Sequence, residues 1–431
     1  MHSEDETSEA IVIDQAVDAA MQEIRLRNRL QMSERFRRVR RQSLVIAEPL
    51  SAEDCCVQSM PDASPVKWHL AHTSWFFETF ILERFEPNFH AWHPAYRVLF
   101  NSYYEGVGEK FPRPQRGLLT RPALDEVLAY RKDIDQRMLR LIEASKGWRD
   151  GEMDVGGFDT LLELGLQHEQ QHQELMLTDI KHLLSINPLK PAYQAPTPAL
   201  RDSAALATPL EWRSFEAGIV QVGHDEDGFC FDNELPLHRQ FVEAFACASR
   251  LVSNLEYLQF IEAGGYDDPA LWLSEGWEWR RQLNLYQPLY WQQDEAGNWL
   301  EFTEYGLLPL ESHRAALHLS YYEADAYARW AGARLLTEAE WEHAACEPRV
   351  EGIEFFGVAW QWTSSSYAPY PGFSAPQGAV GEYNGKFMVN QYVLRGSSIA
   401  TPLNHARLSY RNFFPAAARW QFSGIRLAKS L

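Results

Sequence analysis

The chain has few cysteines and none of the spacings on which cysteine frameworks are built. Its five cysteines are an odd number, contain no CxxC pair and follow no hydrophobic secretory leader; they lie at positions 55, 56, 230, 247 and 346. Disulfide-stapled secreted domains and cysteine-based zinc modules are therefore not expected. The pattern predicts a reducing, cytoplasmic setting, and it leaves open whether Cys55 and Cys56 have a role beyond packing.

The sequence also lacks a long hydrophobic run and an excess of basic charge. No stretch approaches the roughly 18 uninterrupted apolar residues of a membrane span. Its 40 Lys and Arg residues face 59 Asp and Glu residues, which gives a net charge of −19. We therefore expect neither nucleic acid nor an anionic membrane as a partner. Apolar residues interleave the one basic cluster, Arg25 to Gln42, and predict a long helix with one buried side and an arginine-rich solvated side.

The chain is long enough and apolar enough to form large hydrophobic cores. With 431 residues, of which 45% are hydrophobic and 13% aromatic, it has material for two or three domains. Residues 14–187 read as mostly helical, residues 188–211 as a linker rich in proline and alanine, and residues 212–431 as a loop-rich α+β domain. We expect one helix to open at Thr120 with Pro122 in its first turn, and two later helices to be capped by Ser253 and Ser320.

The motif HEQQHQE at residues 168–174 is the strongest chemical signal. His168 and His172 are four residues apart, so on a helix both imidazoles share one face and can reach one metal ion. A helix is predicted because apolar residues recur around the motif at helical spacing, namely Phe158, Leu161, Leu162, Leu166, Leu175, Ile180 and Leu184. Such a pair also occurs by chance on solvated faces, so a third ligand decides the interpretation.

A third imidazole is available upstream in WHLAHTSWFFE. His69 and His72 both lie on another expected helix, next to the aromatic residues Trp75, Phe76 and Phe77. Four long helices carrying three inward histidines predict a bundle with a metal in its core. Three neutral imidazoles leave coordination positions open, which suits catalytic zinc or non-haem iron, and the spacing does not choose between them.

Several motifs together resemble a known two-domain family. The N-terminal part is similar to the DinB-like four-helix metal bundle, through MPDASPVKWHLAHTSWFFE, LFNSYYEGVG and HEQQHQELMLTD. The C-terminal part is similar to the C-type-lectin-like domain of formylglycine-generating enzymes, through RLLTEAEWEHAA, WQWTSSSY, VLRGSS and RWQFSGIRLA. In this order the pair resembles the ergothioneine sulfoxide synthases (EgtB), which implies an α bundle followed by an α+β domain.

The resemblance implies an iron(II) enzyme that uses dioxygen to join a thiol to the imidazole ring of hercynine as a sulfoxide. It places the iron ligands on His72, His168 and His172, and it makes His69 an ordinary packed histidine. Glu174 points away from the ligand face of an ideal helix, and we interpret it as structural.

Further site residues are also implied by the family pattern. Tyr103 and Tyr104 read as ordinary packing by themselves, but the resemblance makes at least one of them the catalytic acid. Without the resemblance, Arg113 would be taken for an ordinary solvated arginine. The family pattern implies that it binds the carboxylate of the thiol substrate, with Arg116 as a second candidate. The residues expected at hercynine, whose trimethylammonium group suits aromatic faces, are Gln171, Asn412, Phe413 and Phe414.

One departure from the family pattern bears on the thiol. Members that use gamma-glutamylcysteine carry a Trp-Asp pair and an arginine in the C-terminal loop, where this chain has Phe413, Phe414 and Ala418. We therefore expect free cysteine as the thiol donor, with gamma-glutamylcysteine as the alternative. An ovothiol-type synthase acting on histidine is less expected because no methyltransferase domain follows. A formylglycine-generating enzyme is less expected because it would need a C-terminal cysteine pair, and no cysteine follows Cys346. A metal-stabilised binding module is the non-enzymatic alternative.

Overall fold

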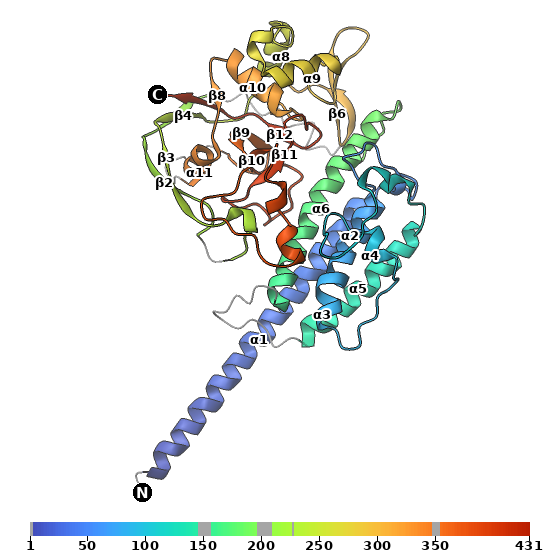
Figure 1. Cartoon of the computed structure of the whole chain (residues 1–431), viewed down its shortest axis with the longest axis vertical. Helices are drawn as coiled ribbons and strands as arrows, with labels where there is room; N and C mark the ends of the chain where they lie inside the picture. Colours follow the sequence, from blue (N-terminus) through green and yellow to red (C-terminus); the bar gives the residue numbers. More distant parts are fainter. Residues whose placement is uncertain (1–2, 145–156, 196–208, 226–227, 347–353) are drawn as a thin grey trace. The chain divides into compact units, whose positions relative to one another are not determined.

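The structure is a computed structural model that describes residues 3–144, 157–195, 209–225, 228–346 and 354–431. Its contacts divide the chain into two compact units (Figure 1). The first unit consists of Met1–Cys56, Pro65–Ser102 and Lys110–His172. The second consists of Val57–Ser64, Tyr103–Glu109 and Gln173–Leu431. The expectation of a helical N-terminal part followed by a domain that mixes helices and strands is confirmed.

Four long helices make up most of the first unit, as the helical periodicity predicted. They are α1 (Ser3–Ala47), α2 (Val66–Phe77), α5 (Leu124–Ala144) and α6 (Phe158–Ile186), the last of which ends in the second unit. Shorter elements connect them: η1 (Asp54–Cys56), the π-helix η2 (Glu78–Leu82), α3 (Glu83–Phe85), α4 (Tyr96–Leu99) and η3 (Arg113–Leu118). Within the described residues, none of the helices is both long and apolar enough to cross a membrane.

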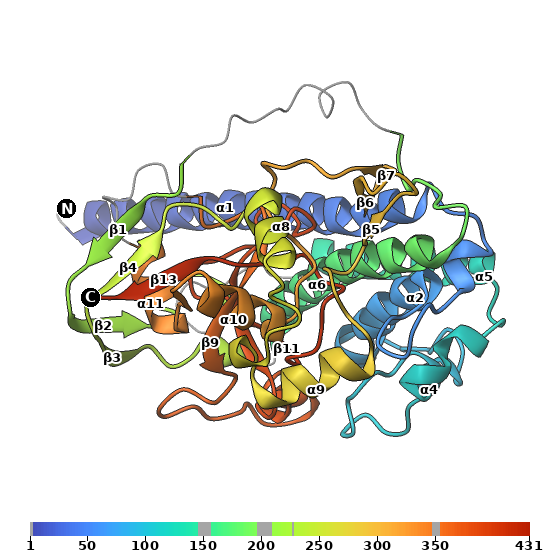
Figure 2. The same cartoon turned by 90° about the horizontal axis from the view of Figure 1, so that it is seen from above.

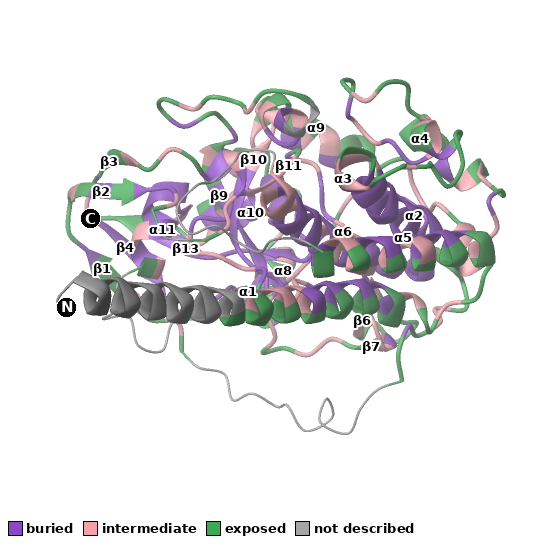
Figure 3. Cartoon of the chain, turned by 90° about the horizontal axis from the view of Figure 1, so that it is seen from below, coloured by how far each residue is buried: buried purple, intermediate pink, exposed green. Residues whose placement is uncertain are grey.

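Helix α2 lies at the centre of the first unit and is buried along its whole length (Figure 3). Its aromatic residues Trp75, Phe76 and Phe77 are each at most 1% exposed. Helix α6 can approach this aromatic surface because residue 165 is a glycine. A Cβ atom at Gly165 would lie 2.6 Å from a ring carbon of Phe77.

Two details of the helical unit differ from expectation. Helix α5 begins at Leu124 rather than at Thr120, because the carboxylate of Glu126 accepts a hydrogen bond from the backbone N–H of Ala123 at 2.7 Å and so satisfies the group that precedes the helix. The arginine-rich side of α1 is not wholly solvated. Arg40 is 2% exposed, because it forms ion pairs with Asp135 and Glu169 inside the bundle.

The described part of the second unit contains four small sheets. Their strand orders are β1-β4-β13-β8, β11-β10-β9-β12, β2-β3 and β5-β6-β7. The strands are β1 (Trp212–Phe215), β2 (Gly218–Val222), β3 (His238–Val242), β4 (Phe245–Ala248), β5 (Trp291–Gln293), β6 (Trp299–Thr303), β7 (Gly306–Pro309), β8 (Arg334–Leu335), β9 (Trp360–Ser366), β10 (Tyr392–Gly396), β11 (Asn412–Phe414), β12 (Ser423–Gly424) and β13 (Leu427–Ser430). Figure 2 shows β1, β4 and β13 side by side.

Besides the end of α6, four α-helices lie among the described residues of the second unit. They are α8 (Asn254–Glu262), α9 (Ser274–Gln282), α10 (Tyr321–Trp330) and α11 (Glu338–Cys346). The predicted caps are confirmed: the side chain of Ser253 begins α8, that of Ser320 begins α10, and each is part of a complete capping box. One part of the core gathers around Trp341 of α11, which packs with Phe215, Phe245 and Leu336.

Candidate metal centre

The three predicted ligands converge in the first unit. His72 comes from α2, whereas His168 and His172 come from successive turns of α6. One ring nitrogen from each lies within 4.8 Å of the others, which makes this the one cluster of potential metal ligands among the described residues. The Nε2 atoms of His72 and His168 are 3.2 Å apart.

The imidazole of His72 is fixed by a carbonyl group and by two indole rings. Its Nδ1 atom lies 2.6 Å from the backbone oxygen of Phe100, so Nδ1–H donates there and the lone pair of Nε2 is left for a metal. Trp68 stacks on the ring with centroids 4.5 Å apart, and Trp75 stacks on it at 5.3 Å. These tryptophans precede His72 by four residues and follow it by three, so helical geometry brings both beside the ligand.

His172 is oriented by a fourth histidine. The Nδ1 atoms of His69 and His172 lie 2.8 Å apart and share one hydrogen bond, and when Nδ1–H of His172 is the donor, the lone pair of its Nε2 is left for a metal. His69 is therefore a partner of a candidate ligand as well as a packed side chain. A hydrogen bond to the second ring nitrogen is the usual way in which proteins orient metal-bound imidazoles.

Electrostatics keep the three candidate ligands uncharged. Burial lowers the pKa of His72 and His172 well below the ordinary value, and it lowers the pKa of His168 to about 3. Neutral imidazoles are the form that binds metal ions. Two metal–nitrogen bonds of about 2.1 Å at a right angle place their nitrogen atoms roughly 3 Å apart. The observed 3.2 Å between His72 and His168 fits such a pair of ligands.

Glu169, next to His168, fixes α6 in the bundle. Its carboxylate accepts hydrogen bonds from Arg131, from Arg40 at 2.9 Å and from Ser43 at 2.6 Å. Burial alone would raise its pKa, but the two arginines lower the pKa to about 2. The charged cluster therefore links α6 to α1 and α5 directly beside a candidate ligand.

Glu174, two residues after His172, has a structural set of contacts, as expected. In the second unit its carboxylate accepts hydrogen bonds from Trp360 Nε1 at 2.7 Å, from Ser398 Oγ at 2.5 Å and from Thr401 Oγ1 at 2.9 Å. Three neutral donors from two segments of the second unit therefore hold the continuation of the ligand helix.

Tyr103 and Tyr104 lie in a loop that belongs to the second unit. Their rings stack at 4.6 Å and their hydroxyl oxygens are 3.4 Å apart. Burial raises the pKa of both phenols well above the ordinary value, so both are protonated at neutral pH. Each phenol can therefore donate a proton or a hydrogen bond.

The two candidate arginines have different environments in the first unit. Arg113 is exposed, whereas Arg116 is 3% exposed. The guanidinium of Arg116 lies 3.4 Å from the ring centre of Trp68 and donates to Ser102 Oγ at 3.2 Å. Since Trp68 also stacks on His72, a cation lies close to the histidine cluster. Gln171 is half-buried on α6, directly before His172.

Asn412, Phe413 and Phe414 form strand β11 at the edge of a sheet in the second unit. The ring of Phe413 stacks on Tyr367 at 4.0 Å, and that of Phe414 meets Trp420 edge-on at 5.8 Å. One face of Phe413 is therefore already covered. All three residues keep part of their surface exposed.

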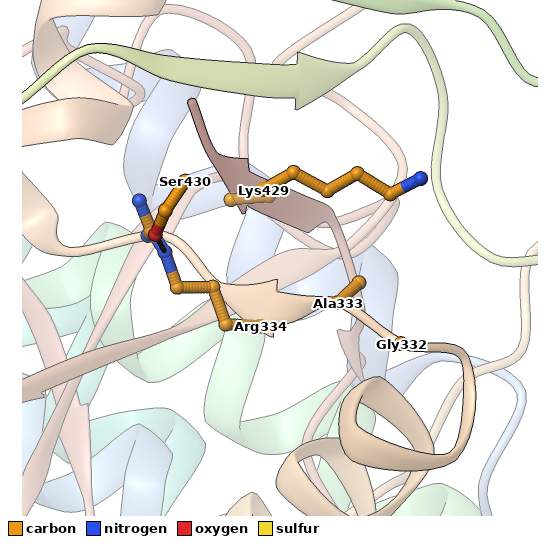
Figure 4. Close-up of a pocket in the computed structure, with 6 residues that line it drawn as sticks. Gly332, Ala333, Arg334, Lys429 and Ser430 are labelled. Atoms are coloured by element: carbon orange, nitrogen blue, oxygen red, sulfur yellow. Dashed lines mark hydrogen bonds between the residues drawn. The ribbon is translucent and has the colours of Figure 1, made fainter.

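The second unit also has a pocket of about 300 Å³ that contains none of the candidate ligands or substrate-binding residues (Figure 4). It is lined by Gly332, Ala333, Arg334, Ala428, Lys429 and Ser430. Its arginine is bound to Glu340 at 2.7 and 2.8 Å and to Ser430 at 3.0 Å, and Lys429 lies over the ring of Trp212. None of the expected site residues lines it.

Comparisons with known families bear out the two-domain expectation. The DinB superfamily matches residues 35–176. The sulfatase-modifying factor enzyme 1-like domain matches residues 211–353. The DinB match ends after all three candidate ligands, and the second match begins just before β1.

Two relatives align with the chain across both of these matched regions. The chain is 29% identical to the hercynine oxygenase of Mycobacterium tuberculosis, over 91% of this chain and 96% of that one. It is 28% identical to the hercynine oxygenase of Mycolicibacterium thermoresistibile, over 85% and 88% of the two chains. The ergothioneine biosynthesis protein 1 of Schizosaccharomyces pombe is 27% identical over 47% of this chain and 28% of its own length. The resemblance to EgtB is confirmed, and with it the expectation of an oxygenase-type oxidoreductase.

Proposed function

We propose that this protein, which has the two domains and the full-length relatives of an EgtB-type sulfoxide synthase, uses iron(II) and dioxygen to join cysteine to hercynine in ergothioneine biosynthesis. The observation that carries the proposal is the convergence of His72, His168 and His172 on α2 and α6, in a chain that aligns with hercynine oxygenases over nearly its whole length. The structure shows no disulfide among its five cysteines, all of which are described, and this fits the reducing compartment that such a thiol substrate requires.

The proposed reaction balances with dioxygen as the one oxidant. One ring C–H bond of hercynine and the S–H bond of cysteine break, while a C–S bond and an S–O bond form. Dioxygen accepts four electrons: one oxygen atom remains on sulfur, and the other leaves as water with the two hydrogens. The protein must therefore bind two organic substrates together and manage protons at the oxygen that leaves.

The three histidines would hold the iron through their Nε2 atoms. Iron(II) bound there would supply the Lewis-acid and redox chemistry that brings the thiol, the imidazole ring and dioxygen to reaction. The contribution of the chain is to keep the imidazoles neutral by burial and to aim their lone pairs. Phe100 does this for His72 through its carbonyl oxygen, and His69 does it for His172.

Tyr103 and Tyr104 are the proposed proton donors. Because burial keeps both phenols protonated, either can supply a proton as oxygen is reduced. Their hydroxyl groups are close enough for one to relay a proton to the other.

Cationic and aromatic side chains are the proposed substrate anchors. Arg116, whose guanidinium lies over the ring of Trp68 beside His72, is proposed to bind a carboxylate, and Arg113 at the start of the same 3-10 helix offers an exposed second cation. Gln171 and the β11 residues Asn412, Phe413 and Phe414 are proposed for hercynine, whose trimethylammonium group is attracted by aromatic faces.

Cysteine is the proposed thiol because the loop after β11 has no cation for a glutamyl carboxylate. Residue 418 is a buried alanine. The neighbouring Arg419 does not replace the missing arginine, since it donates to the backbone oxygen of Gln287 at 2.6 Å and pairs with Glu323 at 3.4 Å. Gamma-glutamylcysteine remains the alternative thiol, and histidine the alternative acceptor for an ovothiol-type reaction.

The test is a product assay with the purified chain. Protein loaded with iron(II) without oxygen is mixed with oxygen, hercynine and either cysteine or gamma-glutamylcysteine, and the products are identified by mass spectrometry. We expect hercynylcysteine sulfoxide, with kcat/KM for cysteine well above that for the dipeptide. A preference for the dipeptide would refute the thiol assignment, and a preference for histidine would favour the ovothiol-type reaction. The absence of any coupled product and of oxygen uptake would favour a metal-stabilised binding module.

A further inference from the structure

The loop that carries Tyr103 and Tyr104 is held by a segment far away in the sequence, Glu382–Phe387. The two carboxylate oxygens of Glu382 accept hydrogen bonds from the backbone N–H of Glu105 at 2.9 Å and of Gly106 at 2.7 Å. The ammonium group of Lys386 donates to the backbone oxygen of Tyr103 and pairs with Glu382 at 2.8 Å. Three backbone groups of the tyrosine loop thus bind one ion pair.

The same segment also contacts the ring of Tyr103. Phe387 meets this ring edge-on with centroids 5.2 Å apart, and Tyr383 does so at 6.2 Å. The ammonium group of Lys386 lies 5.2 Å from the ring centre. Together with the stacking of Tyr104 on Tyr103, these contacts restrict the orientation of both phenols.

The segment is itself anchored in the second unit. Asn384 is 4% exposed and donates to the carboxylate of Asp232 at 2.6 Å. Tyr383 stacks on Phe231 with centroids 5.4 Å apart. The backbone oxygen of Phe387 accepts a hydrogen bond from Gln391 at 3.0 Å. These contacts fix the Glu382–Phe387 segment in the second unit. The ion pair of Glu382 and Lys386 in turn fixes the tyrosine loop relative to this segment.

Stability alone does not account for this arrangement. Glu382 and Lys386 keep 23% and 33% of their side-chain surface exposed, and partly exposed ion pairs contribute little to folding, on the order of 0–1 kcal/mol. Accurate placement of a proton donor, in contrast, is worth a large factor in rate, because a displacement of about 1 Å can lower a rate roughly a hundredfold.

We propose that Glu382 and Lys386 are positioning residues that hold the Tyr103–Gly106 loop and fix the orientation of its two phenols. This proposal rests on the proposed function, since it presupposes that Tyr103 or Tyr104 donates a proton. It assigns a role to a segment whose motif, GEYNGKF, is more than 270 residues away from the loop in sequence.

The test compares this ion pair with a matched one. Glu382→Ala and Lys386→Met remove the two charges, and Glu382→Gln retains oxygen and amide groups for partial rescue. Asp325→Ala and Arg329→Met are the controls, because these residues form an ion pair of the same i,i+4 spacing in α10, also in the second unit, at 2.7 Å. Amide hydrogen exchange, kcat, KM and iron content are measured for each variant.

We expect Glu382→Ala to speed exchange at the amides of Glu105 and Gly106 about tenfold, while the controls leave it unchanged. We also expect kcat to fall roughly ten- to a hundredfold, with both KM values and the iron content near those of the parent. Glu382→Gln should fall between the parent and Glu382→Ala. In the Tyr103→Phe/Tyr104→Phe background, Glu382→Ala should lower kcat no further.

Two results would overturn the proposal. One is exchange at Glu105 and Gly106 that is the same in Glu382→Ala as in the Asp325→Ala control. The other is a loss of kcat that persists in full in the phenylalanine background, which would show that Glu382 acts independently of the tyrosines. If the parent protein forms no coupled product, the proposed function fails and the catalytic role of the pair fails with it. The exchange data then report separately whether the pair holds the loop.

Discussion

His69 and His172 meet through their Nδ1 atoms at 2.8 Å, so that a histidine which is no candidate ligand orients one that is. The contact fixes the orientation of the His172 ring, and Nε2 of His172 has a free lone pair when Nδ1–H of His172 is the donor. A ligand that is oriented in advance loses less entropy when it binds a metal ion, and outer partners of this kind change metal affinity substantially.

Replacing His69 should therefore weaken metal binding. His69→Phe removes the hydrogen-bond partner, and we expect the dissociation constant for iron(II) to rise roughly ten- to a hundredfold. His69→Gln can still accept through its amide oxygen and should lose less. Anaerobic titration calorimetry measures both, with His313→Gln on an exposed position as the control. Equal affinity in His69→Phe and in the control would show that His69 only packs.

A methyl group at residue 165 should disturb the contact between α6 and α2. The added Cβ atom of Gly165→Ala would lie 2.6 Å from the ring of Phe77, which is itself fully buried. We expect the free energy of unfolding to fall by about 1–3 kcal/mol, as in other overpacked cores. Gly218→Ala is the control, because no heavy atom outside the adjoining residues lies within 4 Å of the position of its Cβ. Urea denaturation measures both; an unchanged midpoint for Gly165→Ala would contradict the close approach.

Glu174 should matter for folding rather than for the metal. Glu174→Ala leaves the buried donors of Trp360, Ser398 and Thr401 without their acceptor, and we expect a loss of about 2–3 kcal/mol in the free energy of unfolding. In Glu174→Gln the amide oxygen can accept from Trp360 and Ser398 while the amide group donates to Thr401, so most of the stability should remain. Iron(II) affinity should be that of the parent in both variants. A large loss of affinity in Glu174→Gln would instead indicate a direct role at the metal.

His318 should make the stability depend on pH. Burial, and next the charge of Lys181 with its Nζ atom 2.8 Å away, lower the pKa of His318 well below the ordinary value. Arg419 acts in the same direction, and Glu304 pairs with Lys181 at 3.4 Å. The folded protein therefore keeps His318 neutral, whereas the unfolded chain takes up a proton below about pH 6.5, and stability is lost as the pH falls below that value.

The parent should consequently lose more stability than His318→Gln when the pH is lowered from 7.5 to 5.5. One histidine that protonates only in the unfolded chain accounts for a difference of about 1.4 kcal/mol over this interval. The other buried histidines contribute equally to both proteins, so the comparison isolates His318. Urea denaturation at the two pH values is the measurement. Parallel losses in the parent and the variant would mean that His318 is protonated in the folded protein.

The sequence predicts the parts of this protein that depend on local spacing. Helical periodicity locates α6 and brings His168 and His172 to one face, and the serine-to-glutamate spacing identifies the caps of α8 and α10. The predicted start of α5 at Thr120 is too early, because the carboxylate of Glu126 satisfies the backbone of Ala123 from inside the helix. The sequence did contain a signal for the observed start. Glu126 follows Ala123 by three residues, which is the spacing between the N-cap residue and the glutamate of a capping box.

Contacts between distant segments were beyond the reach of these patterns. The burial of Arg40 depends on Glu169 and Asp135, which lie 129 and 95 residues further along the chain. The hydrogen bond from the backbone N–H of Glu105 to Glu382 joins residues that are 277 positions apart in the sequence. For the stacking of Trp68 and Trp75 on His72 a local signal did exist, in their spacing of four and three residues from the ligand.

The most direct test of the whole account is the metal content of the histidine variants. The parent and the variants His72→Ala, His168→Ala and His172→Ala are titrated anaerobically with iron(II), and bound iron is measured after gel filtration together with the circular dichroism spectrum. We predict one iron per chain in the parent and a loss of binding in each variant at unchanged helix content. Stoichiometric iron in any of the three folded variants would contradict the claim that these histidines form the metal site.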